Sequence, residues 1–131
     1  KLIELGHQSG AKFCYIMSTG LMPLLETFRE MGVDILYGVD PVQGGADLPR
    51  IKREVGDRIC LWGGVNSAIT LGHGTKEDIE EAVTKAIGTL APGGGFILSA
   101  IDQLFDYTPS ENIIAMIDAW RRAGAYPTQK F

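Results

Sequence analysis

Short apolar runs alternate with amphipathic stretches four times along the chain. Each run is bounded by glycine or polar residues, which is typical of a strand buried on both faces. We predict strands near residues 13–17, 33–37, 58–62 and 95–99.

A stretch with helical periodicity follows each predicted strand. The clearest opens at Thr75, an N-cap with Asp78 at the third helical position. Asp47 is the expected N-cap of the preceding helix. Pro109 and the polar residues beside it predict the start of the last helix, whose residues Ile113, Met116, Ile117 and Trp120 are expected to face inward. The expected helices cover residues 21–31, 47–55, 75–90 and 109–123, and residues 1–11 resemble the end of a preceding helix.

Regular strand–helix alternation predicts an α/β fold with a parallel sheet covered by helices. The four units could form an open doubly wound domain or half of a TIM (β/α)₈ barrel. A half-barrel would leave strand edges unpaired at 13–17 and 96–99. We then expect a homodimer that rebuilds eight strands, or packing against a separate N-terminal half. The chain begins without Met in a helix-like segment, so we expect a fragment that forms one domain over 1–131.

Composition narrows the partners and the compartment. The formal net charge is -4 and no Lys/Arg-rich run occurs, so nucleic acid and anionic membranes are not expected partners. No apolar stretch is long enough to span a membrane, and the first residues do not form a signal peptide. Cys14 and Cys60 lie in apolar strand-like runs, which predicts buried, reduced thiols in a cytoplasmic protein.

In both candidate architectures the active site lies at the carboxyl ends of the strands. Asp40 and Asp102 each follow a strand there, where a carboxylate can act as an acid or base or bind a substrate nitrogen. Either could instead cap a nearby amide; Asp102 is the stronger catalytic candidate because no helix start lies close to it. Five further residues in these loops are candidates for substrate or cofactor binding: Ser18, Gln43, Gly64, Asn66 and Ser67.

Other candidates carry less weight. Asn66 and Ser67 could donate to a substrate carbonyl or close an Asx turn. His73 is expected at the rim of the site, and the triple glycine 93–95 precedes a strand and so lies on the opposite face. The two cysteines have no close Cys or His, so no zinc site is predicted.

Several short motifs follow one another between residues 12 and 123. They are the segments 22–26, 32–36, 40–41, 47–48, 51–56, 61–66, 74–75, 94–98 and 109–112. Their order and spacing resemble the uroporphyrinogen decarboxylase superfamily. The resemblance implies that the chain supplies the fifth to eighth βα units of a barrel.

That superfamily includes decarboxylases, which act on a tetrapyrrole without a cofactor, and corrinoid-linked methyltransferases, which often use zinc. Members of the decarboxylase branch carry a Leu-Gly-His-Gly segment just after the final strand. The matching stretch of this chain, residues 98–102, contains no histidine. Leu71-Gly72-His73-Gly74 follows the wrong strand. The methyltransferases' zinc ligands would fall near 15–19 and at 101, where no ligand residue stands.

The resemblance therefore implies a zinc-free enzyme of corrinoid- or tetrahydrofolate-linked methyl transfer, with a corrinoid protein as a candidate partner and cobalamin or tetrahydrofolate as candidate cofactors. Asp40, Asn66 and Asp102 would bind the N–H groups of a pterin ring. A decarboxylase relative is the first alternative, although all six arginines fall on predicted helices or at the beginning of a strand. A non-catalytic half-barrel module is the second.

Overall fold

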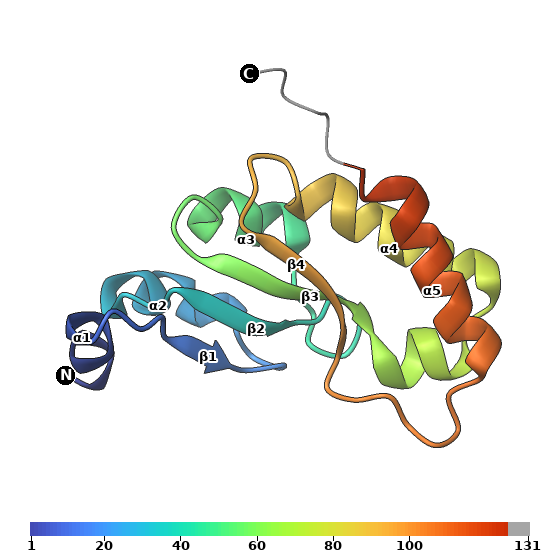
Figure 1. Cartoon of the computed structure of the whole chain (residues 1–131), viewed down its shortest axis with the longest axis horizontal. Helices are drawn as coiled ribbons and strands as arrows, with labels where there is room; N and C mark the ends of the chain where they lie inside the picture. The colour runs from blue at the N-terminus through green and yellow to red at the C-terminus, as the bar shows by residue number, and fades with distance from the viewer. Residues whose placement is uncertain (126–131) are drawn as a thin grey trace.

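Four parallel strands lie side by side in chain order, β1-β2-β3-β4 (Figure 1). In the computed structural model, which describes residues 1–125, they span Cys14–Ile16 (β1), Ile35–Val39 (β2), Cys60–Asn66 (β3) and Phe96–Ile101 (β4). The helices are α1 (Leu2–Gln8), the short 3₁₀ turn η1 (Met22–Leu24), α2 (Leu25–Met31), α3 (Leu48–Val55), the π-helical turn η2 (Ser67–Leu71), α4 (Lys76–Leu90) and α5 (Ser110–Ala123). The α/β fold with a parallel sheet, predicted from the pattern, is confirmed, and the half-barrel that the family resemblance implied agrees with the strand order.

The strand register separates the side chains of the sheet into two faces. Tyr15, Leu36, Leu61 and Phe96 are paired in a row across all four strands. This row packs against α2, α3 and α4, and Leu36 and Leu61 are fully buried there. Because successive residues of a strand point to opposite faces, the neighbouring row lies on the face that these helices do not cover.

The neighbouring row consists of Ile16, Tyr37, Trp62 and Ile97. Ile16 is 72% exposed and Ile97 is 40% exposed. In a closed eight-stranded barrel this face fills the interior with side chains. The four strands therefore present one finished face and one face with no covering layer in residues 1–125.

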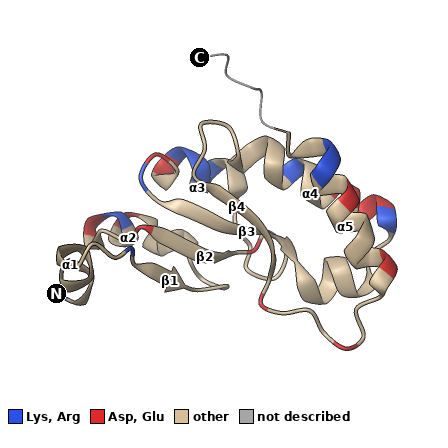
Figure 2. Cartoon of the chain, in the orientation of Figure 1, with Lys and Arg blue, Asp and Glu red and all other residues tan. Residues whose placement is uncertain are grey.

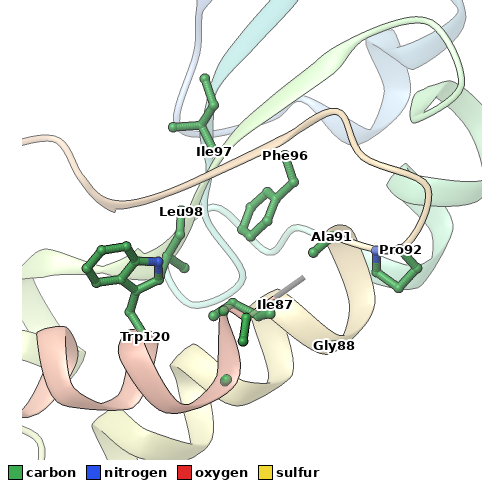
Figure 3. Close-up of a pocket in the computed structure, with 11 residues that line it drawn as sticks. Ile87, Gly88, Ala91, Pro92, Phe96, Ile97, Leu98 and Trp120 are labelled. Carbon is green, nitrogen blue, oxygen red and sulfur yellow. The ribbon is translucent and has the colours of Figure 1, made fainter. Parts of the chain in front are cut away.

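Several large apolar side chains of helix α5 are exposed to solvent and are not buried against the rest of this chain. The expected inward face of the helix is confirmed only in part. Met116 packs against the core and Ile113 is half-buried, but the buried residues are Asn112, Ala115 and Ala119. Ile117 and Trp120 are 40% and 49% exposed. Together with α4 and β4, Trp120 borders an apolar cleft of about 630 Å³ (Figure 3), where it lies beside Leu98. Small residues allow α5 to approach α4 closely, and the larger ones project beyond the last strand.

Three strands extend further at their carboxyl ends than the pattern predicted, and β4 reaches Ile101. β2 continues to Val39 and β3 to Asn66, past glycines that the sequence suggested were loop residues. Gly64 has a φ of 101°, and a Cβ there would lie 2.8 Å from the Cβ of Ala86 on α4. The glycine allows the strand and the helix to approach closely without ending the strand.

The predicted burial of Cys14 is also wrong. Cys14 is exposed because it lies on the edge strand and on the open face, whereas Cys60 is partly buried. Burial raises the pKa of the Cys60 thiol, and the proximity of Cys14 raises it further. The register places Ile35 between the two cysteines. Two strand spacings, about 9–10 Å, exceed the Cα separation that a disulfide allows.

Asp34 ties the first helix to the sheet at the amino ends of the strands. Its carboxylate accepts hydrogen bonds from the Phe13 backbone N–H at 2.8 Å and from Lys12 Nζ at 2.8 Å, and it lies 2.6 Å from His7 Nε2. Lys12, the Phe13 amide and His7 together hold the pKa of Asp34 far below its usual value of 3.8. His7 is at the surface, as expected, and its side chain also joins α1 to the rest of the chain through Asp34.

Because the pKa of Asp34 is depressed in the folded protein, its stabilising effect is present above about pH 4 and is lost as the pH falls through the folded-state pKa. We expect Asp34→Asn to lower the urea midpoint at pH 7 and to make stability less dependent on pH below pH 4. Glu30→Gln, at an exposed carboxylate on α2, is the matched control and should leave the acid dependence unchanged. Identical acid profiles for Asp34→Asn and the unmodified protein would contradict this assignment.

Candidate functional site at the carboxyl ends of the strands

A buried polar cluster lies where β2 and β3 end. Asp40 and Asn66 are each 2% exposed. Asn66 Nδ2 donates to Asp40 Oδ2 at 2.8 Å and to Gln43 Oε1 at 2.9 Å. Three of the residues that the sequence predicted for the site are therefore brought together within hydrogen-bonding distance.

The cluster uses nearly all of its own hydrogen-bonding groups. Asp40 Oδ1 accepts from the Val42 N–H at 2.8 Å, and Asn66 Oδ1 accepts from the Ile69 N–H at 2.7 Å, which caps η2. Both alternatives raised for these residues, an amide cap and an Asx-type turn, are thus observed. The predicted catalytic role of Asp40 remains a prediction, and both its carboxylate oxygens are engaged inside the protein. Gln43 is exposed, and its amide nitrogen donates no hydrogen bond to another group within residues 1–125.

Ser67 and Ser18 flank the cluster. Ser67 is 1% exposed, and its Oγ is buried with no hydrogen-bond partner among residues 1–125. A buried hydroxyl without a partner is costly and is a group that a ligand can satisfy. Ser18 lies in the loop after β1, and a Cβ on Gly44 would lie only 2.2 Å from its carbonyl oxygen. The loops after β1 and β2 are therefore in backbone contact beside Asp40.

Asp102, like Asp40, follows a strand, but the two aspartates differ in burial and in hydrogen bonding. It follows Ile101, whose register partner is Asn66, so its loop begins beside the polar cluster. Its side chain is exposed, and within residues 1–125 the carboxylate has no hydrogen-bond partner. Its backbone adopts a φ of 70°. Asp102 is the carboxylate available to a ligand at this edge of the sheet.

Gly64 lies so close to Ala86 of α4 that a larger residue would not fit, so packing against the helix accounts for the glycine. Its predicted binding role remains untested. His73 lies at the rim, as expected, and stacks on Tyr107 with ring centroids 5.3 Å apart; Tyr107 in turn stacks on Phe105 at 5.1 Å. This ring stack joins the loop after β3 to the loop after β4.

Asn112 is a site-supporting residue that the sequence argument missed. It is 8% exposed, and its Nδ2 donates to the carbonyl oxygens of Leu71 and Gly74 at 2.9 and 3.1 Å. It therefore fixes α5 to the loop that follows η2. No signal within a few residues of Asn112 in the sequence indicated these partners.

The mouth formed by these loops carries charge of one sign only. The segments 17–21, 40–47, 67–75 and 102–109 contain no Lys, Arg or Glu, and their charged residues are Asp40, Asp47, Asp102 and Asp106. Figure 2 shows that the Lys and Arg residues belong mainly to the helices and not to the strands. Within residues 1–125 no three His, Cys, Asp or Glu side chains are grouped closely enough to hold a metal ion. No helix in that part of the chain is long and apolar enough to cross a membrane.

A parallel half-barrel with polar groups gathered at the carboxyl edge is the arrangement of a TIM-barrel enzyme half. Residues 4–123 match the uroporphyrinogen decarboxylase (URO-D) family, so the chain belongs to that family. The resemblance and the fold predicted from the motifs are confirmed.

The proteins that this chain resembles are longer than the chain itself. It is 30% identical over 95 residues to a uroporphyrinogen decarboxylase of Coxiella burnetii (strain RSA 493 / Nine Mile phase I) and 32% identical over 95 residues to one of Methylobacillus flagellatus. Each match covers 72% of this chain and 25% of the relative, so the chain spans about a quarter of these relatives. A methyltransferase from Methanosarcina mazei has a similar structure, with a TM-score of 0.75 and 22% identity over 95% of this chain and 35% of that one.

The polar cluster yields a stability prediction. Asn66→Ala leaves the buried Asp40 carboxylate without its amide donor and removes the η2 cap, so we expect the free energy of unfolding to fall by about 2–3 kcal/mol. Gln43→Ala, which removes an exposed partner of the same amide, should cost under about 1 kcal/mol. Urea unfolding of both variants measures the difference, and equal losses would show that the cluster is not the stabilising unit described here.

Proposed function

We propose that the chain supplies four βα units of an enzyme that transfers methyl groups in a tetrahydrofolate- or corrinoid-linked reaction. The observation that carries this proposal is the acidic mouth, whose only charged side chains are aspartates. Opposite charge and hydrogen-bond complementarity select ligands at such a mouth. The N–H groups of a pterin ring or the amide groups of a corrinoid suit carboxylate and amide partners. The two carboxylates of tetrahydrofolate are on its glutamate tail and would lie outside the mouth, whereas a tetrapyrrole with carboxylates around its ring faces repulsion.

Three side chains are proposed to contact the ligand. Asp102 is an unpaired carboxylate acceptor for ring N–H groups, and it can hold or release a proton at its Oδ atoms. Gln43, whose Oε1 accepts from Asn66, offers its amide nitrogen, and Ser67 offers a buried hydroxyl with no partner of its own among residues 1–125. The donors and acceptors that remain free therefore fit a neutral, N–H-rich ring. When bound, tetrahydrofolate or a corrinoid partner protein would carry the methyl group.

Asp40 and Asn66 are proposed to act from beneath this surface. Their mutual hydrogen bond fixes the end of β3 and the orientation of Gln43. Preorganised partners of this kind position a ligand without reorganisation when it binds. Substitutions there should change the affinity through the position of the loops.

A decarboxylase-like activity on a tetrapyrrole is the second candidate, and the curated relatives favour it. Against it stands the absence of Lys and Arg from the four loops that follow the strands. An acidic mouth opposes a substrate that carries several carboxylates. A non-catalytic half-barrel that only binds partners is the third candidate and predicts no turnover with either class of substrate.

Calorimetric titration distinguishes these candidates. We expect tetrahydrofolate or methylcobalamin to bind and uroporphyrinogen to remain unchanged after incubation with the protein. Asp102→Asn should weaken tetrahydrofolate binding about tenfold to a hundredfold, since a hydrogen bond to a charged group contributes about 1.5–3 kcal/mol. Glu30→Gln, at an exposed carboxylate on α2 outside the mouth, is the control and should change the affinity less than about threefold. Loss of carboxyl groups from uroporphyrinogen would overturn the proposal in favour of the decarboxylase.

The uncovered sheet face leads us to propose that the working unit contains eight strands. Open edges and exposed apolar side chains on β1, β4 and α5 need a covering layer, from a second copy of the chain or from a separate set of four βα units. Light scattering should give a mass near twice 14.2 kDa if two copies close the barrel. A monodisperse monomer whose Trp120 fluorescence resembles that of a solvent-exposed indole would contradict closure by self-association.

A further inference from the structure

Asp102 is held in a conformation that non-glycine residues rarely adopt. Among residues 1–125 it is the only non-glycine residue with a positive φ, at 70°. The left-handed region brings the Cβ of an L-residue close to its own backbone, although aspartate tolerates it better than most residues. Strained backbone of this kind persists only where surrounding contacts enforce it.

The contact that enforces it comes from a strand that is not adjacent to β4. The Tyr37 hydroxyl donates to the Asp102 carbonyl oxygen at 3.1 Å and accepts from the Asp102 backbone N–H at 3.1 Å. One hydroxyl can serve both roles because it carries one donor hydrogen and two acceptor lone pairs. Both backbone polar groups of Asp102 are thus bound to a single side chain on β2, and the carboxylate is left free.

Tyr37 is itself fixed by the open row of the sheet. Its ring meets Trp62 edge-to-face, with centroids 5.2 Å apart and an interplanar angle of 88°. Trp62 lies on β3, between Tyr37 and Ile97 of β4 in the register. The tyrosine therefore passes over β3 and reaches the carboxyl end of β4 with its ring orientation set by the indole.

We propose that Tyr37 is a positioning residue that holds Asp102 in its left-handed conformation and so presents the carboxylate to the mouth. This inference rests on the proposed role of Asp102 in ligand binding. Removing the hydroxyl while keeping the ring frees the Asp102 backbone, and the carboxylate then loses its fixed direction. The effect on a ligand passes through Asp102 and disappears when that carboxylate is absent.

A stability cycle tests the first half of the proposal without a ligand. In the full chain as it assembles in solution, Asp102→Gly should raise the urea midpoint, because glycine adopts positive φ without the strain. In the Tyr37→Phe background the same substitution should give no increase, because the loop no longer holds that conformation. An equal increase in both backgrounds would overturn the proposal.

Tetrahydrofolate affinity tests the second half. Tyr37→Phe should weaken binding about tenfold, and Asp102→Asn on its own should weaken it at least as much. Adding Tyr37→Phe to Asp102→Asn should cause no further loss. Tyr107→Phe removes another tyrosine hydroxyl at the mouth and should leave the affinity unchanged. Additive losses from Tyr37→Phe and Asp102→Asn would show that Tyr37 does not act through Asp102. If the unmodified protein binds neither tetrahydrofolate nor methylcobalamin, the methyl-transfer proposal fails, and the stability cycle alone decides the role of Tyr37.

Discussion

The parallel arrangement of the four strands is the constraint on which the other features depend. Parallel strands end at the same edge of a sheet, so side chains that are distant in sequence meet there. The register that brings Asn66 beside Ile101 also sets the row from Ile16 to Ile97 on the face without helices. The polar site and the incomplete apolar face are therefore two results of one hydrogen-bonded ladder.

The site divides into a fixed part and a free part. The Asn66 amide nitrogen donates to Asp40 and Gln43, and its side-chain oxygen accepts from the Ile69 N–H, so few hydrogen-bonding groups of Asn66 are left for a ligand. Asp102 has the opposite character, with its backbone restrained and its carboxylate unengaged. Two aspartates that look alike in sequence thus have different chemistry, because one lies inside the packed loops and the other beyond the last strand.

Much of the fold could be predicted from local signals. The capping box of Thr75 and Asp78 and the N-cap Asp47 are observed, because caps depend on neighbours only a few residues away. The end of β3 was missed because Gly63 and Gly64 suggested a loop, whereas tight contacts with Val39 and Ala86 require glycine within the strand. The face of α5 was only partly predicted because its apolar stripe suits a layer that residues 1–125 do not contain. Among site residues, the grouping of Asp40 and Asn66 could be expected from the strand ends. The contact between Tyr37 and Asp102 spans 65 positions in sequence and had no local signal.

The single sign of charge at the mouth also affects how fast ligands arrive. A cleft lined by carboxylates raises the local concentration of cations and lowers that of anions, over a distance set by the Debye length of about 8 Å at physiological salt. Encounter with a polyanion is therefore slow at low ionic strength and becomes faster as salt screens the aspartates. The same mouth treats an uncharged ring almost identically at every salt concentration. The placement of four aspartates on the loops thus acts as a kinetic filter before any hydrogen bond to a ligand has formed.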